Sequence, residues 1–115
     1  MKTIIVIGGS KGIGNAILKT LVGTHNVINI SRSTPETSHN NLTHHQCDVI
    51  QNELPEIENA DGLVYCPGSI NLKPISRLSI DDFKDDFEIN VLGAVKVIQK
   101  YLSILKNGDH WVNQI

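Results

Sequence analysis

Runs of aliphatic residues alternate along this chain with stretches in which apolar residues recur every three or four positions. The first run, Lys2–Ile7, shows no apolar–polar alternation and is bounded by glycine, which is typical of a central parallel strand covered on both faces. Further apolar runs predict strands at 27–30 and 62–66. Helical spacing from Ile13 to Leu21 predicts a helix of about three turns that stops at Gly23.

The remaining short elements are more polar or are interrupted. Residues 42–47 predict a third strand whose polar side chains suit a sheet edge, and 31–41 is predicted to be a loop. Pro55 interrupts the helical offsets of 48–58, so any helix there is short or broken. Residues 110–115 begin like a fifth strand. Strands that alternate with helices imply right-handed crossovers and a parallel sheet that binds its ligand at the carboxyl ends of the strands.

The most regular pattern predicts a long helix over 79–106, which ends at Gly108–Asp109. Ser79 can cap its start, while acidic residues in the first turns and lysines in the last turns suit the helix dipole. One apolar face is expected, formed by Ile80, Phe83, Phe87, Val91, Ala94, Ile98, Tyr101 or Leu102, and Leu105. We expect Phe83 and Phe87 to lie in the core.

A glycine turn, Gly8–Gly14, joins the first strand to the first helix. A phosphate requires backbone N–H groups with no Cβ in the way, and a glycine turn before a helix N-terminus supplies them, with the helix dipole adding partial positive charge. The fold class predicted is therefore α/β, a partial Rossmann-type doubly wound parallel sheet of four to five strands. The alternative is a turn that merely connects strand to helix. The spacing is Gly-x-x-x-Gly-x-Gly, not the commoner Gly-x-Gly-x-x-Gly.

Length and charge restrict the domain organisation and the partners. With 115 residues the chain is expected to form one incomplete NAD(P)-binding domain, 1–115. Its net charge is -2 and it has no basic stripe, so nucleic acid is not expected as a partner. The apolar run before the first glycine is too short for a signal peptide or a membrane span, which makes the cytoplasm the default location and membrane association unexpected.

Cysteines and histidines suggest neither a disulfide nor a metal site. Cys47 and Cys66 are far apart in the sequence and end apolar runs, so we expect buried free thiols. His39, His44 and His45 have no cysteine or carboxylate at ligand spacing, and adjacent histidines on a strand point to opposite faces. No metal is therefore expected.

The chain resembles the short-chain dehydrogenase/reductase family, whose glycine motif has the spacing found here, and the resemblance covers Thr3 to Leu105. It implies that Gly8, Gly12 and Gly14 shape the turn and that the backbone of Ser10–Ile13 lies against the phosphates of the cofactor. It also implies that the 79–106 helix can pack against its twin in another subunit, which is the alternative to a core position for its phenylalanines.

Two cations and a serine suggest which dinucleotide is bound. Arg32 follows Ser31 and lies eighteen residues after Gly14, where an NAD site would carry a carboxylate for the ribose 2′-OH. An arginine pairs instead with a 2′-phosphate. Family members with a basic residue in the glycine loop, such as Lys11, and another after the second strand are typically NADP-dependent, so NADP(H) is expected and NAD(H) is less favoured. The alternative for Arg32 is a solvated loop charge.

Further cofactor contacts are implied by the resemblance. Asp48 and Val49 follow the third strand, where the family meets the adenine amino group and ring; the alternative for Asp48 is a helix N-cap. The family's Asn-Asn-Ala-Gly turn is matched only at Gly68 in the segment Tyr65–Gly68. A backbone contact from Cys66 and Gly68 to the nicotinamide ribose remains possible because it needs no particular side chain.

Asn90 and Gly93 lie within the long predicted helix, where both residue types are less stable than alanine. In the family this asparagine is part of the active site, and its backbone carbonyl holds a water of the proton relay. The resemblance therefore implies a catalytic role for Asn90. The alternative is an ordinary polar residue tolerated in a helix.

The family's catalytic serine and its Tyr-x-x-x-Lys have no match in this sequence, since Tyr65 is followed at that offset by Ser69 and Tyr101 by Leu105. Losing a general acid alone costs about 10²–10⁴ in rate. We therefore predict the NADP(H)-binding portion of an oxidoreductase that transfers hydride to or from a carbonyl or alcohol, truncated before its catalytic residues and inactive alone. The alternatives are a non-catalytic nucleotide-binding or interaction module, and a nonfunctional gene remnant.

Overall fold

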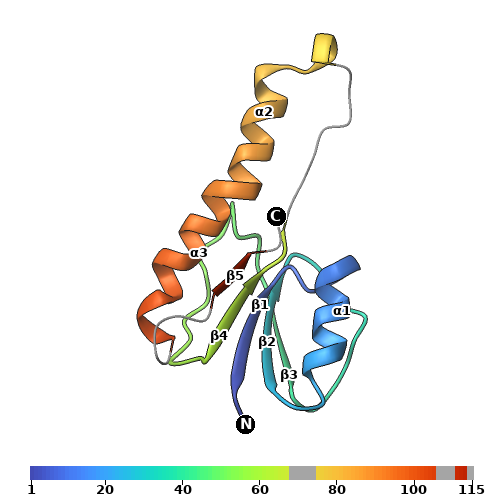
Figure 1. Ribbon diagram of the computed structural model, residues 1–115, viewed down its shortest axis with the longest axis vertical. Coiled ribbons are helices and arrows are strands. Elements are labelled where there is room, and N and C mark those ends of the chain that lie inside the picture. The colour runs from blue at the N-terminus through green and yellow to red at the C-terminus, as the bar shows by residue number, and fades with distance from the viewer. Residues whose placement is uncertain (68–74, 106–110, 114–115) are drawn as a thin grey trace.

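The computed structural model describes residues 1–67, 75–105 and 111–113, which build a five-stranded parallel sheet with helices on both faces (Figure 1). The sheet order is β3-β2-β1-β4-β5. The strand bounds are β1 Thr3–Ile7, β2 Asn26–Ser31, β3 Leu42–Gln46, β4 Gly62–Tyr65 and β5 Trp111–Asn113. The sequence predictions of a central first strand, a polar edge strand at 42–47 and a fifth strand are confirmed.

Register aligns the carboxyl ends of the inner strands. Ile7 pairs with Ile30 of β2 on one side and with Tyr65 of β4 on the other. Ser31 in turn pairs with Gln46 at the end of β3. The loops that follow these strands therefore leave the sheet at one edge, as the predicted parallel topology requires.

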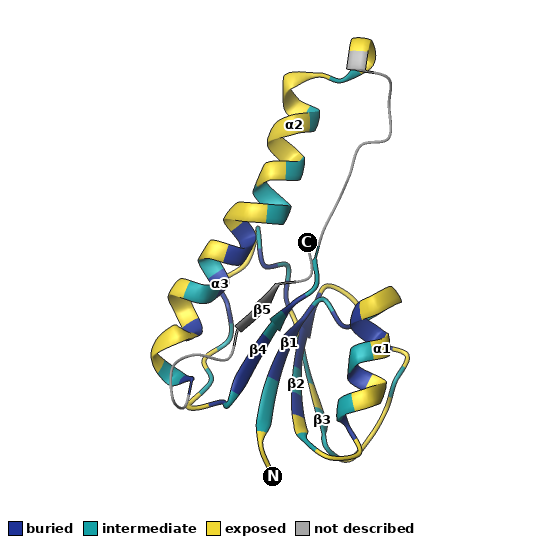
Figure 2. Ribbon diagram, in the orientation of Figure 1, coloured by how far each residue is buried: buried dark blue, intermediate teal, exposed yellow. Residues whose placement is uncertain are grey.

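Each face of the sheet has its own apolar cluster (Figure 2). On one face, α1 (Gly12–Leu21) packs Leu18 against Val6 and Val27. On the other face, α3 (Gly93–Tyr101) packs Val97 and Tyr101 into a larger cluster. Burial on both faces explains why the inner strands read as continuous aliphatic runs.

The predicted long helix is present but is not a uniform α-helix. It consists of α2 (Ile80–Phe87), a π-helical turn η2 (Glu88–Leu92), α3 and a 3₁₀ turn η3 (Leu102–Ile104), and a short 3₁₀ turn η1 (Ile75–Arg77) precedes it. Ser79 caps α2 as predicted. Its hydroxyl accepts from the Asp82 N–H, and the Asp82 carboxylate accepts from the Ser79 N–H. The predicted stop at 108–109 lies outside the described residues.

The prediction that Phe83 and Phe87 lie in the core is wrong. Their exposed fractions are 51% and 55%, because α2 extends beyond the sheet and the described residues do not cover it (Figures 1 and 2). The helix packs buried side chains on the sheet from Gly93 onward, through Ala94 and Val97, and Tyr65 of β4 also donates a hydrogen bond to Ile89. Among the described residues, no helix is both long and apolar enough to cross a membrane.

Candidate nucleotide-binding site

A cleft of about 810 Å³ lies at the carboxyl edge of the sheet. This volume lies within the range of small-molecule sites, which is about 300–1,000 Å³. Eight of the residues predicted from the sequence line it: Gly8, Ser10, Lys11, Ser31, Arg32, Asp48, Val49 and Cys66. The fold thus brings the segments that follow four strands, β1 to β4, to one cavity.

Three glycines of the turn are each required by the backbone geometry. Gly8 and Gly12 have φ of 82° and 60°, a region that side chains with a Cβ rarely adopt. At Gly14 an added Cβ would lie 2.1 Å from the carbonyl oxygen of Gly8, so glycine lets α1 start directly against the turn. Gly12 and Gly14 do not line the cleft; they shape the backbone that does.

The start of α1 has the features of an anion site. Its N-cap is Lys11, which makes no side-chain hydrogen bond to the helix, and its first turn has no acidic residue. The first amide N–H groups of the helix therefore lack the side-chain acceptor that usually caps them. Ile13 follows in the first turn, and its side chain is 59% exposed.

The loop after β2 forms the next wall of the cleft. Ser31 is buried and its hydroxyl donates to the Ser33 carbonyl oxygen over 2.7 Å, which bends the chain around Arg32. Arg32 and Lys11 are both exposed and line the same cleft. These two cations favour an anionic group beside them, and carboxylates from other segments, Asp48, Asp85 and Glu88, also line the cleft.

Asp48 has a structural role that was predicted as an alternative. Its Oδ1 accepts from the N–H groups of Ile50 at 2.9 Å and Gln51 at 3.3 Å. Asp48 therefore caps a turn, because the residues that follow it form a turn and not the helix expected of an N-cap. Val49 is 8% exposed and presents its apolar side chain at the cleft. Together they form a wall that suits a planar ring with a polar edge.

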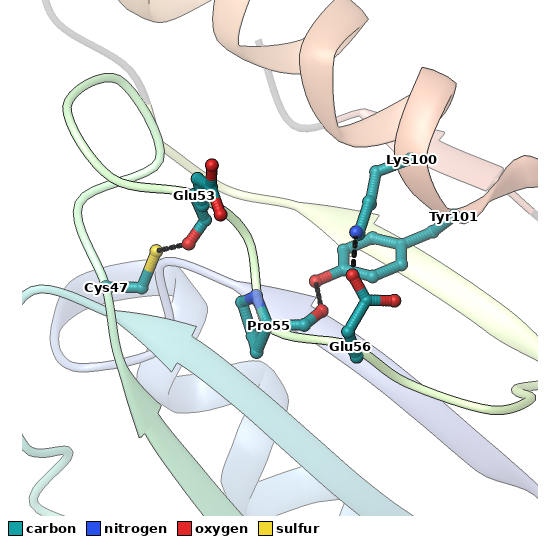
Figure 3. Close-up of polar contacts among 6 residues, drawn as sticks. All are labelled: Cys47, Glu53, Pro55, Glu56, Lys100 and Tyr101. Carbon is teal, nitrogen blue, oxygen red and sulfur yellow. Dashed lines mark hydrogen bonds and ion pairs between the residues drawn. The ribbon is translucent and has the colours of Figure 1, made fainter.

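Helix α3 holds the loop that carries Asp48 and Val49. The Lys96 Nζ donates to the carbonyl oxygens of Val49 at 2.6 Å and Asn52 at 2.7 Å. Figure 3 shows the next contacts along this loop, in which Tyr101 donates to the Pro55 carbonyl oxygen over 2.7 Å and Lys100 pairs with Glu56. Sequence reasoning missed this clamp, because it assigned Lys96 and Lys100 only to the helix dipole.

The same close-up includes Cys47, whose thiol donates to the Glu53 carbonyl oxygen over 3.4 Å. Burial raises the pKa of Cys47 and of Cys66, and both are free cysteines, as predicted. Cys47 is buried, whereas Cys66 is half-buried. Thiols with raised pKa are poor nucleophiles near neutral pH, so these residues serve as apolar lining of the cleft.

Tyr65 occupies the position of the first asparagine of the family's tetrapeptide, and it contacts the long helical segment. In the π turn the Gly93 N–H donates to Glu88, five residues back, and the hydroxyl of Tyr65 donates to the carbonyl oxygen of Ile89 over 2.6 Å. A Cβ on Gly93 would lie 2.3 Å from that hydroxyl. Burial raises the pKa of Tyr65 to about 12, so it is not a proton donor suited to neutral pH.

Asn90 lies inside this π turn, a type of helix irregularity that is often found at functional sites. Its neighbours Glu88 and Ile89, together with Asp85, line the cleft, although sequence reasoning did not select them and Asn90 itself is not among the described lining residues. No signal in the sequence marks a π turn beyond the pair of helix-disfavouring residues. Gly68, the other predicted contact, lies outside the described residues.

Comparison with known proteins identifies the family. A family model described as short chain dehydrogenase matches residues 2–111. The chain therefore belongs to the short-chain dehydrogenase family, an oxidoreductase family that binds nicotinamide dinucleotides.

Relatives show how much of the family's length is present. The chain is 29% identical over 116 residues to the benzil reductase ((S)-benzoin forming) of Bacillus subtilis (strain 168), covering 88% of this chain and 48% of that protein. A short chain dehydrogenase family protein from Francisella tularensis superposes with a TM-score of 0.85 at 26% identity, over 99% of this chain and 50% of its own. The chain thus spans about half the length of these relatives.

A short chain dehydrogenase from Leptospira borgpetersenii, solved with bound NAD+, superposes with a TM-score of 0.82 at 19% identity. The superposition covers 97% of this chain and 50% of that protein. This likeness shows the fold, and the predicted partial Rossmann-type α/β fold is confirmed.

Proposed function

We propose that this chain binds NADP(H) in the cleft at the carboxyl edge of its sheet, as the cofactor-binding portion of an oxidoreductase that acts on a carbonyl or alcohol. The observation that carries the proposal is the juxtaposition of an uncapped helix start, a turn of three glycines without Cβ atoms, and two exposed cations on one cavity. The first two features suit a pyrophosphate, and the third suits an additional phosphate.

Each proposed contact has a distinct chemical role. The amide N–H groups of Ser10–Ile13 donate to the pyrophosphate, and Gly8, Gly12 and Gly14 give the turn the backbone shape that this requires. Arg32 pairs with the ribose 2′-phosphate, assisted by Lys11 and Ser31. These contacts distinguish NADP(H) from NAD(H), because an arginine offers donors where a ribose 2′-OH would need an acceptor.

The adenine and nicotinamide ends use the remaining loops. Asp48 and Val49 meet the adenine, and the carboxylate of Asp48 has an oxygen besides the one that caps the turn. The backbone at Cys66 and Gly68 meets the ribose on the nicotinamide side. When bound, the nicotinamide ring supplies the position at which hydride is gained or lost.

Asn90 is proposed as the residue of this chain that belongs to the catalytic machinery. Its carbonyl would hold a water of the proton relay, and its place in a π turn supports a functional reason for the irregularity. The proton donor itself is not assigned to Tyr65 or Tyr101, because both hydroxyls are buried and donate to backbone carbonyls.

The phosphate that discriminates the two cofactors can be tested with fragments. Calorimetric titration with adenosine 2′,5′-bisphosphate and with adenosine 5′-monophosphate isolates the 2′-phosphate from the nicotinamide. We expect the bisphosphate to bind about tenfold more tightly or better, the value of a charge-assisted hydrogen bond. Equal dissociation constants would contradict the NADP(H) assignment, and binding of neither fragment would contradict the dinucleotide site.

A second proposal concerns self-association through the long helical segment. Seven exposed apolar side chains lie on it: Ile80, Phe83, Phe87, Val91, Leu92, Val95 and Leu102. Exposed apolar side chains in such number are typical of an interface, and a second copy of the same helix offers the same side chains. Sedimentation equilibrium tests this, with a monomer at all concentrations as the contradicting result.

A further inference from the structure

Asn29 is a fully buried amide in the middle of a strand, where an aliphatic residue would normally lie. Its exposed fraction is 0%, and in β2 it lies between the buried Val6 of β1 and the half-buried His44 of β3. A buried amide is costly unless its polar atoms find partners. Both polar atoms of the Asn29 side chain have partners, and these partners lie in the glycine turn, at the end of β2 and on β3.

The amide oxygen of Asn29 holds the glycine turn. The N–H of Gly9 donates to Oδ1 over 2.9 Å. The fit is close, since a Cβ on Gly9 would lie 2.4 Å from this oxygen and 2.8 Å from the Leu18 side chain. Asn29 therefore fixes the position of the turn at Gly9.

The amide nitrogen of Asn29 holds the neighbouring loop. Its Nδ2 donates to the Ser31 hydroxyl over 2.9 Å and to Nδ1 of His44 over 3.0 Å. The Ser31 hydroxyl in turn donates to the Ser33 carbonyl oxygen. Ser31 and Ser33 flank Arg32, so one side chain connects the glycine turn with the loop that carries this cation.

We infer that Asn29 is a positioning residue for the dinucleotide. It does not line the cleft and touches no part of the ligand's space, but it sets the relative position of the phosphate-binding turn and the arginine loop. The inference rests on the proposed function. It goes beyond that function by assigning the geometry of both phosphate contacts to a single buried amide on β2.

The test uses Asn29→Leu, which keeps the branching and the number of side-chain heavy atoms and removes all three hydrogen bonds. We expect it to weaken NADPH binding about tenfold or more, as the loss of a preorganised buried hydrogen bond would, measured by calorimetry below the melting temperature of each variant. The matched control is Asn41→Leu. Asn41 also donates through Nδ2, to the Val22 carbonyl oxygen over 2.8 Å, but at the opposite edge of the sheet. We expect the control to lose stability and to keep its NADPH affinity within about twofold.

A second measurement keeps this inference separate from the proposed function. Hydrogen exchange at the Gly9 amide of the free protein should be slow in the wild type and in Asn29→Asp, which retains the acceptor, and fast in Asn29→Leu. If the wild type binds NADPH and Asn29→Leu binds it equally well, Asn29 is not a positioning residue. If the wild type binds no dinucleotide, the proposed function fails. Independently of that result, an unchanged exchange rate at the Gly9 amide in Asn29→Leu would show that Asn29 does not position the turn. If Asn29→Leu does not fold, the comparison is made with Asn29→Ala.

Discussion

The start of α1 and the α2 half of the long helical segment differ in what determines their structure. At α1, Gly8 and Gly12 shape the turn through their own backbone angles, and Gly14 does so through its close approach to Gly8, six positions away. Asn29 of β2 then holds the turn through the Gly9 N–H. At α2, the amphipathic pattern is equally regular, yet its aromatic side chains are exposed. The glycine positions of the first region are thus determined locally, whereas the burial of the second depends on what lies against it. Apolar spacing therefore identifies a helix but does not identify what covers it.

The largest effect on stability and binding is expected at Gly14, where the backbone leaves no space for a Cβ. In Gly14→Ala the new Cβ meets the Gly8 carbonyl oxygen at 2.1 Å, so either the turn or α1 must move. We expect a loss of about 3 kcal/mol in the free energy of unfolding and loss of NADPH binding. The control is Gly23→Ala, where nothing lies within 4 Å of the added Cβ and φ is ordinary. Urea unfolding of both variants measures the difference, and equal stabilities would contradict the account of the turn.

A charge reversal in the arginine loop tests the ligand. In Arg32→Asp a carboxylate replaces the proposed partner of the 2′-phosphate and can accept from a ribose 2′-OH. The ratio of NADPH to NADH affinity should fall by about tenfold or more. Arg77→Asp, in η1 and not among the cleft residues, is the control for net charge and should leave the ratio unchanged. An unaltered ratio in Arg32→Asp would mean that Arg32 is a solvated loop charge.

Unlike α2, the α3 part of the long helical segment is tied to the candidate site, through the clamp from Lys96 to the loop that carries Asp48 and Val49. Lys96→Met removes hydrogen bonds to two backbone carbonyls while keeping much of the aliphatic stem. We expect a loss of about 1.5–3 kcal/mol in the free energy of unfolding, the value of hydrogen bonds from a charged donor. Lys19→Met, an exposed change in the last turn of α1, should cost little. Comparable losses in the two variants would show that the clamp contributes nothing.

Polar substitutions on α2 test whether its exposed face is an interface. The double variant Phe83→Ser, Phe87→Ser should abolish self-association while changing the stability of the monomer by less than about 0.5 kcal/mol for each site. Light scattering over a concentration series detects the change in mass. A wild type and a variant that associate equally would exclude this face.

The smallest effect concerns pH. Burial, and then the charge of His45, lower the pKa of His44 below its ordinary value of 6.5, and a hydrogen bond with the Asn29 backbone opposes this by raising the pKa. The unfolded state therefore takes up the proton first as pH falls, so the stability associated with neutral His44 is complete above pH 6.5 and declines below it. His44→Gln should flatten this part of the profile of unfolding free energy against pH. An identical profile in the variant would exclude His44 as its source.

Most of the fold was predictable because its signals are local. The aliphatic runs, the glycine spacing and the capping serine each determine structure within a few residues, and the sheet, its polar edge and the start of α2 were predicted correctly. The exposed phenylalanines, the π turn and the Lys96 clamp were not, because each depends on contacts between residues distant in sequence. The same holds for Asn29, which resembles an interruption of a strand until its partners on the turn and on β3 are known.

The most direct measurement is a titration of the ¹⁵N-labelled chain with NADPH and, separately, with NADH, followed by amide chemical shifts. The account predicts saturable shifts centred on residues 8–14 and 31–33, with NADPH binding more tightly than NADH by about tenfold or more. Shifts that do not saturate, that lie elsewhere, or that give equal affinity for the two cofactors would contradict the claim that this cleft is an NADP(H) site.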